Sequence, residues 1–288
     1  MARIGLVQVA QRTEDGYKER TDKLLAFARD GFEQGADIVF FPEAYQHVPD
    51  RSVIFRRDEM KEIASEWKER CAALAREYKR YLVPWDYEVS DGKVYNSSYI
   101  LDRNGEEIGR YRKVHLTHSE QARGLTNGDD FPVFELDIGK VGIMICWDNY
   151  FPESARCLGN RGAQLVLYPL YGDTLDPQWE IKLRARAIDN SMHIAFCQID
   201  TYNTAAYTGI VAPDGNVICK MNKAPACRVV EIDLNSPVVT HTTGNTAYSE
   251  NIRQMTERCR RPSAYGALLS EPNVIPWNEV FFGKEPKI

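Results

Sequence analysis

The run GIMICWDNYFPE, residues 142–153, joins an apolar strand pattern to the expected start of a helix. The apolar stretch ends at Cys146, and Pro152 has the fixed φ angle that suits the first turn of a helix. In α/β proteins a nucleophile is often held in this place, on the sharp turn after the carboxyl end of a strand. Cys146 is therefore the candidate nucleophile.

Two other segments end in chemically useful side chains. The apolar run IVFFPE, residues 38–43, ends in the carboxylate of Glu43, and the mixed run YRKVHL, residues 111–116, contains Lys113. A thiol attacks carbon only as the thiolate, so it needs a base or a positive charge close by. A thiol, an acid and an amine at the ends of elements indicate a hydrolase.

The roles of these groups follow from their chemistry. A carboxylate beside Cys146 would take the thiol proton and later return it to the leaving nitrogen. An ammonium group and the backbone N–H of Trp147 would stabilise the negative oxygen of a tetrahedral intermediate.

The composition limits the class of protein and its partners. The 288 residues are 43% hydrophobic and 27% charged, which is typical of a soluble globular protein. A net charge of −5 without basic blocks argues against nucleic acid and membrane partners. Residues 1–9 read as a buried strand rather than a signal peptide, and no apolar run approaches the roughly 18 residues of a membrane span.

The cysteines and one sequon bear on the compartment. Seven widely spaced cysteines without a Cys-x-x-Cys pair argue against a disulfide framework or a zinc site, and we expect a cytoplasmic protein. Asn96-Ser97-Ser98 matches a glycosylation sequon, but this matters only in a secreted chain.

Hydrophobic periodicity predicts alternating strands and helices. We expect helices over 21–32, 58–81, 152–160 and 179–191, and strands over 4–9, 37–41, 82–87, 94–101, 106–112, 133–136, 141–145, 165–167, 194–199, 209–212, 216–219 and 229–232. Hairpin turns are expected at Asn104-Gly105 and at Asp214-Gly215, each after a strand–helix–strand unit, which suggests an internal duplication. The strands are apolar on both faces, so helices should cover a sheet.

The C-terminal residues 244–288 differ in composition from the rest. They mix charge, aromatic residues and proline, and Pro262, Pro272 and Pro276 argue against regular structure there. We expect this tail to pack on the body or on a partner subunit.

Six segments in the same order resemble the nitrilase superfamily of carbon–nitrogen hydrolases. They are FPE at 41–43, YRKVHL at 111–116, CWDNYFPE at 146–153, RAIDN at 186–190, APDG at 212–215 and RRPSAY at 260–265. Each segment alone is modest, but the ordered set covers nearly the whole chain and is highly specific.

The resemblance implies a single domain over 1–288, with an α/β fold that is a four-layer α-β-β-α sandwich and pairs into an αββα-αββα homodimer or larger homo-oligomer. It implies Glu43 as general base, Lys113 as transition-state stabiliser and Cys146 as nucleophile. It also implies a second glutamate before the Gly128-Asp129 pair, a place that Glu120 fits. No metal or cofactor is implied.

The resemblance is closest to N-carbamoyl amine hydrolases and aliphatic amidases, so we expect a small amide or carbamoyl substrate, neutral or cationic. N-carbamoyl-D-amino-acid hydrolases carry an arginine that grips a carboxylate just after Cys-x-Asp, where this chain has Asn149 and Tyr150. The candidate substrate-binding residues are Trp147, Asn149, Tyr45, His115 and Tyr171. His115 and His118 are spaced like a metal pair but have no third ligand.

Two alternatives stay open. One is a nitrile hydrolase with the same triad, and the other is a catalytically idle scaffold or binding protein of this fold.

Overall fold

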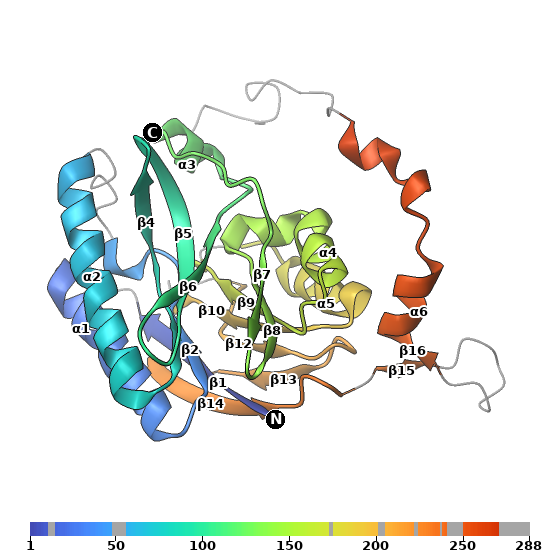
Figure 1. The fold of residues 1–288 in the computed structure, drawn as a ribbon, viewed down its shortest axis with the longest axis horizontal. Coiled ribbons are helices and arrows are strands. Elements are labelled where there is room, and N and C mark those ends of the chain that lie inside the picture. The colour runs from blue at the N-terminus through green and yellow to red at the C-terminus, as the bar shows by residue number, and fades with distance from the viewer. Residues whose placement is uncertain are drawn as a thin grey trace. The chain divides into compact units, whose positions relative to one another are not determined.

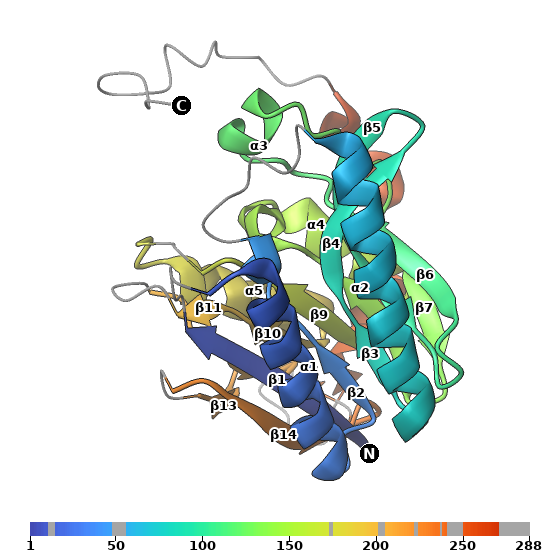
Figure 2. The same ribbon diagram turned by 90° about the vertical axis from the view of Figure 1, so that its left-hand side faces the viewer.

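Two β-sheets, each with two long helices on its outer face, form the main unit of the protein, Met1–Val238 (Figure 1). The computed structural model describes residues 1–10, 15–47, 56–172, 175–200, 205–221, 224–236, 238–240 and 250–270. Figure 2 shows α1 and α2 lying side by side along the outer face of the first sheet. Together the layers give the expected α-β-β-α sandwich.

The first half of this unit contains β1 (Ala2–Ala10), α1 (Tyr17–Glu33), β2 (Ile38–Phe40), α2 (Arg57–Tyr78), β3 (Tyr81–Val83), β4 (Trp85–Ser90), β5 (Lys93–Leu101), β6 (Glu107–Arg112) and the short helix α3 (His118–Ala122). The second half contains β7 (Val133–Leu136), β8 (Gly139–Ile143), α4 (Pro152–Asn160), β9 (Leu165–Pro169), α5 (Trp179–Asn190), β10 (His193–Cys197), β11 (Ile199–Asp200), β12 (Gly209–Val211), β13 (Val217–Lys220) and β14 (Ala226–Ile232).

The two sheets repeat one topology. In the first, the order is β11-β1-β2-β3-β5-β4, with β14 paired to β1 and β6 to β5, and in the second it is β13-β12-β10-β9-β8-β7. The strands β1, β2 and β3 are parallel and β5 is antiparallel to β3, just as β8, β9 and β10 are parallel and β12 is antiparallel to β10. The predicted internal duplication is therefore present in the strand and helix order.

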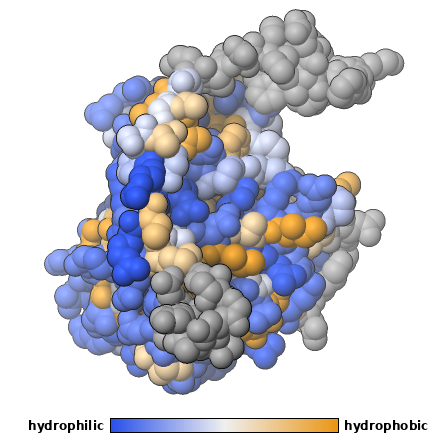
Figure 3. Space-filling view, turned by 90° about the vertical axis from the view of Figure 1, so that its right-hand side faces the viewer, coloured by the Kyte–Doolittle hydropathy of each residue, from blue (hydrophilic) through white to orange (hydrophobic). Residues whose placement is uncertain are grey.

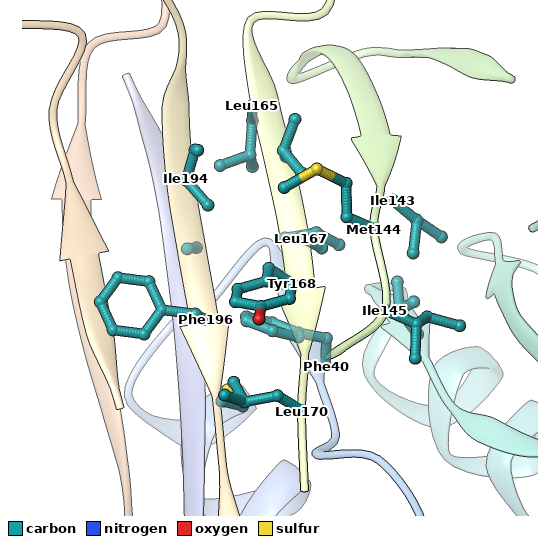
Figure 4. Packing of buried hydrophobic residues seen from close by; sticks show 14 of the residues in the cluster. Phe40, Ile143, Met144, Ile145, Leu165, Leu167, Tyr168, Leu170, Ile194 and Phe196 are labelled. Carbon is teal, nitrogen blue, oxygen red and sulfur yellow. The ribbon is translucent and has the colours of Figure 1, made fainter. Parts of the chain in front are cut away.

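The core follows the two-residue period of the strands. In β2, Ile38 and Phe40 belong to the cluster between the sheets, whereas Val39 belongs to the cluster under α1 and α2. Phe40 belongs to the same buried cluster as Leu167 and Phe196 of the second sheet, part of which Figure 4 shows. Full burial of such a side chain stabilises the fold by about 1.5–3 kcal/mol, so the two layers hold each other in register.

Three elements differ from expectation. The expected strand 82–87 divides into β3 and β4 around Pro84, because proline has no N–H to donate to a ladder. The expected strand 194–199 divides into β10 and β11, and β11 pairs with β1, so the chain passes at Gln198 from the second sheet to the first. The helix α3 was not expected, although Thr117 and Glu120 form its capping box.

The second unit, Val239–Ile288, is described by itself. It contains β15 (Val239–Thr240), β16 (Glu250–Asn251), α6 (Ile252–Cys259) and two short 3₁₀ turns, η4 (Pro262–Ala264) and η5 (Gly266–Leu269). We expected no regular structure in the tail, and this is wrong for residues 252–259, which form α6. The helix ends before Pro262, so the proline does not interrupt it. Pro272 and Pro276 lie outside the described residues, and the packing of the tail stays a prediction.

No helix in the described ranges has both the length and the apolar character needed to cross a bilayer.

Candidate active site

Cys146 lies on a strained turn directly after the second-sheet strand β8. It begins the 3₁₀ turn η3 (Cys146–Tyr150) and has a φ of 46°, a conformation that costs an L-residue about 1–2 kcal/mol. The Tyr168 hydroxyl donates to the Cys146 carbonyl oxygen over 2.7 Å. Tyr168 lies near the end of β9, as Figure 4 shows. The turn thus holds a partly exposed thiol at the carboxyl end of the strand, as the sequence predicts.

Lys113, Glu43 and Glu120 meet in a buried ionic cluster. Lys113 is 1% exposed, Glu43 5% and Glu120 6%. The Lys113 ammonium donates to Glu43 Oε1 at 3.0 Å and to both carboxylate oxygens of Glu120 at 3.0 and 2.9 Å. Glu43 follows β2, Lys113 follows β6 and Glu120 lies in α3, so three separate elements deliver one cluster.

The charges in the cluster stabilise one another. Burial lowers the pKa of Lys113, but the negative charges of Glu43 and Glu120 raise it, and it ends well above its ordinary value. Burial raises the pKa of Glu120, but the Lys113 charge and the hydrogen bonds at this carboxylate outweigh burial and hold it below its ordinary value. The ammonium and the Glu120 carboxylate are therefore both charged at neutral pH. Cys146 interacts electrostatically with Lys113, so the thiol lies close to the cluster.

Asn96, in the middle of β5, contacts every member of the ionic cluster. Its side-chain Nδ2 donates to Glu43 Oε1 at 2.7 Å and to Glu120 Oε1 at 2.6 Å. Its backbone carbonyl accepts the backbone N–H of Lys113 at 2.8 Å. The sequence showed this residue only as part of a sequon, and its 2% exposure leaves no room for a glycan.

Asp148 joins the nucleophile turn to the lysine segment. Its Oδ2 accepts the Tyr111 hydroxyl at 2.6 Å and the backbone N–H of Ile145 at 2.9 Å. Its Oδ1 lies 3.1 Å from the backbone N and 2.9 Å from Nδ1 of His115. This fully buried carboxylate thus ties residues 111–115 to residues 145–148.

A cavity of about 260 Å³ opens over Cys146. The residues that line it come from four parts of the chain and are mostly aromatic or aliphatic: Thr117, Cys146, Trp147, Tyr150, Tyr168, Leu170, Gly172 and Trp179. None of these described lining residues carries a charged side chain. The Trp147 and Tyr150 rings stack at 4.3 Å and make one aromatic wall.

Of the five residues expected to contact the substrate, one lines the cavity and four do not. Trp147 lines the cavity, but Asn149, Tyr45, His115 and Tyr171 are not among its lining residues. Tyr171 reaches the site through its backbone N–H, which donates to Glu43 Oε2 at 3.0 Å. Tyr45 is 2% exposed and packs in the cluster under α1 and α2.

The other two expected contacts serve the turn rather than the cavity. His115 bonds to Asp148 and stacks on Phe151 with ring centroids 3.8 Å apart. The Asn149 side chain is completely buried, and neither of its polar atoms has a hydrogen-bond partner among the described residues. Its backbone carbonyl accepts a hydrogen bond from Arg186 at 3.1 Å.

Sequence reasoning missed most of the cavity wall. Thr117, Tyr150, Tyr168, Leu170 and Gly172 were not proposed as site residues, although each lies within three residues of one that was. The capping box of Thr117 and Glu120 was the available signal for the first. Tyr150 follows Cys146, and Tyr168, Leu170 and Gly172 lie in or just after β9. No sequence motif marks these four residues as part of a cavity wall.

Metal ligation has no candidate among the described residues, in which no group of three or more His, Cys, Asp or Glu side chains is arranged to hold an ion. In the buried cluster the space between the two carboxylates is taken by the Lys113 ammonium.

The sequence and the fold match known proteins over most of the chain. Residues 3–240 match the family model described as carbon–nitrogen hydrolase. The chain is 30% identical to an omega-amidase of Xenopus tropicalis over 250 residues, which cover 81% of this chain and 90% of the relative. It is 31% identical to a probable nitrilase of Schizosaccharomyces pombe over 229 residues, 75% of this chain and 83% of the relative.

Solved structures agree on the fold. An amidase from Nesterenkonia sp. superposes with a TM-score of 0.76 at 23% identity, covering 93% of this chain and 96% of that one. A variant of the same amidase carries the acetamide moiety of fluoroacetamide on its active-site cysteine. With the matched family model and the ordered motifs, these findings show that the chain belongs to the carbon–nitrogen hydrolase family of the nitrilase superfamily.

Proposed function

We propose that this enzyme hydrolyses small amides or N-carbamoyl amines through a covalent intermediate on Cys146. The observation that carries the proposal is the buried Glu43–Lys113–Glu120 cluster close to a cavity that Cys146 lines. The related omega-amidase and the bacterial amidase of the same fold support the same class of bond.

The proposed first half-reaction forms a thioester or a thiocarbamate. Glu43 takes the thiol proton, the Cys146 sulfur bonds to the carbonyl carbon, and the oxygen becomes negative. The Lys113 ammonium and the Trp147 backbone N–H stabilise that oxygen. The C–N bond then breaks, and Glu43 returns its proton to the leaving nitrogen, which departs as ammonia or amine.

In the second half-reaction, Glu43 takes a proton from water as the water oxygen attacks the acyl carbon. The C–S bond breaks, the acid or carbamic acid leaves, and the proton returns to the sulfur. The geometry favours Glu43 Oε2 for both proton transfers, because Oε1 already accepts from Asn96 and Lys113, whereas Oε2 accepts from the Tyr171 backbone N–H.

The cavity wall favours a substrate without a negative charge near the reacting bond. A carboxylate would lose its water there and meet no cation among the described lining residues. An ammonium is better suited, because aromatic ring faces attract cations.

The experiment that tests the proposal is ammonia release from a matched panel. Aliphatic amides are compared with ω-amino and ω-carboxylate analogues of equal chain length, and N-carbamoyl amines with N-carbamoyl amino acids and nitriles. We expect release from the neutral or cationic amides or carbamoyl amines, none with Cys146→Ala, and normal release with Cys157→Ala, which removes an exposed thiol.

Each other outcome points elsewhere. Full activity of Cys146→Ala would remove the covalent mechanism. A preference for the ω-carboxylate analogues would overturn the charge argument, and conversion of nitriles alone would favour the nitrile hydrolase. No release together with a Cys146 that iodoacetamide alkylates no faster than Cys157 would favour an idle scaffold.

We also propose a homodimer or larger homo-oligomer in the cytoplasm. The helix α5 exposes Ile181 at 66% and Ile188 at 44%, and Figure 3 shows apolar side chains among the polar ones on the face of the molecule that lies to the right in Figure 1. Sedimentation of the full chain beside a chain that ends at Gly244 tests both this and the packing of the tail. A monomer would contradict the first proposal, and an unchanged oligomer after truncation would remove the tail from the interface.

A further inference from the structure

The ionic cluster contains more negative than positive charge. Lys113 supplies one positive charge, and Glu43 and Glu120 supply two negative charges, all on side chains that are at most 6% exposed. A buried excess of negative charge favours protonation of one carboxylate unless other donors stabilise both.

The Asn96 side chain supplies a donor to each carboxylate. Its amide nitrogen has two N–H bonds, and the two acceptors within reach are Glu43 Oε1 at 2.7 Å and Glu120 Oε1 at 2.6 Å. One planar group therefore fixes two carboxylates relative to each other. These are also the two oxygens that accept from the Lys113 ammonium at 3.0 Å.

The orientation of this amide is fixed by Trp85. The indole N–H of Trp85 donates to Asn96 Oδ1 at 2.6 Å, and an indole N–H can only donate. The amide oxygen must therefore face the indole, and the nitrogen must face the carboxylates. Rotation of the amide by 180° would place an oxygen against two carboxylates and a nitrogen against an N–H.

Trp85 is itself held in place from two sides. Its backbone carbonyl accepts the Gln46 side-chain amide at 2.6 Å and the Trp67 indole N–H at 3.2 Å. Both Trp85 and Asn96 are at most 2% exposed, so solvent does not compete for these bonds. A chain of single-orientation hydrogen bonds thus runs from α2 to the ionic cluster.

We propose that Asn96, oriented by Trp85, is a positioning residue that fixes the Glu43 and Glu120 carboxylates relative to each other around Lys113, and so holds Glu43 where it can accept the Cys146 proton. The proposal rests on the function proposed above. Asn96 contacts no reacting atom, and it acts through the carboxylates and, by its backbone carbonyl, through Lys113.

Two site variants and one control test the proposal. Asn96→Asp replaces the donor by a third carboxylate of the same shape. Trp85→Phe keeps an aromatic ring but removes the N–H that orients the amide. Asn190→Asp places a carboxylate at another buried asparagine, whose side chain donates to the Arg186 carbonyl in α5.

We expect Asn96→Asp to lower kcat by about ten- to a hundredfold, the effect of losing hydrogen bonds to charged groups, with KM little changed. Added negative charge disfavours the thiolate and the second carboxylate, so the acid limb of the kcat/KM profile moves to higher pH. Trp85→Phe also moves the acid limb to higher pH, but by less than Asn96→Asp does. Asn190→Asp leaves the limb where it is in the wild type.

The alkylation rate of Cys146 by iodoacetamide, measured against pH, gives a second readout that needs no substrate. It separates failure of this proposal from failure of the proposed function, because a wild type without hydrolysis still reports the pH at which Cys146 becomes reactive. We expect that pH to rise in Asn96→Asp and in Trp85→Phe. Circular dichroism and thermal melting establish which variants are folded.

An unchanged acid limb and an unchanged alkylation profile in a folded Asn96→Asp would overturn the proposal. If Asn96→Asp does not fold, Trp85→Phe is the test. A shift of its kcat/KM or alkylation profile to higher pH supports the positioning role, and profiles equal to those of the wild type overturn it. A shift of equal size in Asn190→Asp would also overturn it, because the effect would then be one of buried charge in general.

Discussion

The Tyr111 hydroxyl donates to Oδ2 of Asp148 over 2.6 Å, and this bond joins the strand before Lys113 to the turn that carries Cys146. Burial and the negative charge of Asp148 raise the pKa of Tyr111 well above its ordinary value, so the hydroxyl stays protonated and keeps donating. The distance between amine and thiol thus depends on one buried carboxylate.

Replacing that carboxylate should disturb both stability and catalysis. In Asp148→Asn one acceptor oxygen becomes an NH₂ group, which faces donors such as the Ile145 N–H or the His115 N–H. We expect a loss of about 2–4 kcal/mol in the free energy of unfolding and a fall in kcat of at least about tenfold. Urea denaturation and steady-state kinetics measure these. Asp214→Asn, in an exposed turn, is the control and should change neither.

Removing the charge of Glu120 should give a pH-dependent loss of stability. The pKa of Glu120 lies below its ordinary value of 4.5 in the folded protein, so its contribution is present above pH 4.5 and is lost as the pH falls through the folded pKa. Glu120→Gln should therefore be less stable than the wild type by on the order of 3 kcal/mol at pH 7, and the difference should shrink in acid.

The control for Glu120→Gln is Glu135→Gln. Glu135 is an exposed carboxylate paired with Lys140 at 2.7 Å, and exposed pairs contribute little to stability. Denaturation curves at several pH values for the three proteins test the prediction. A Glu120→Gln deficit that is constant from pH 7 to pH 3 would contradict it.

The positive φ of Cys146 predicts an unusual stability effect. Glycine adopts this conformation without strain, whereas alanine does not. We expect Cys146→Gly to be more stable than Cys146→Ala by about 1 kcal/mol, with both inactive. Ser191→Gly, at a residue with a φ of 47° after α5, is a positive control for the relief of strain. Thermal melts compare them, and a less stable Cys146→Gly would argue against strain at the nucleophile.

The Tyr168 hydroxyl should matter through the carbonyl that it holds. Tyr168→Phe frees the Cys146 carbonyl and loosens the turn, so we expect kcat to fall by about three- to tenfold with KM nearly unchanged. Tyr99→Phe is the matched control, because the buried Tyr99 hydroxyl has no hydrogen-bond partner among the described residues. Equal activities of the two variants would show that the bond to Cys146 is dispensable.

Most elements were predictable because they depend on local pattern. Nearly continuous apolar runs mark strands such as β1 and β9, and helical spacing marks α2 and α5. The misses also have local reasons: Pro84 divides a strand, and α3 is a five-residue helix too short for a periodic signal. The capping box of Thr117 and Glu120 is the one feature of this segment that indicates the start of a helix.

The site was predictable in part. Glu43, Lys113 and Cys146 follow strands in motifs whose order identifies the superfamily, so the residues that meet were named in advance. Asn96 was not, because nothing in its own segment distinguishes a buried amide between two carboxylates from a surface sequon. Tyr45 and His115 are expected at the substrate from their residue type but are not among the lining residues of the cavity, because aromatic type alone does not tell which way a ring faces.

The sequence by itself determined the strands and helices, which depend on periodicity, and the candidate acid, amine and thiol, which depend on residue chemistry, whereas the two-sheet sandwich was implied only by the resemblance to the superfamily. Only the tertiary structure decided the arrangement of the ionic cluster and the cavity. The pairing of β5 with β6 sets Asn96 beside Lys113, and the pairing of β8 with β9 sets Tyr168 beside Cys146. Such contacts join residues far apart in the chain, and they arise from strand register and from sheet packing, which no single segment encodes.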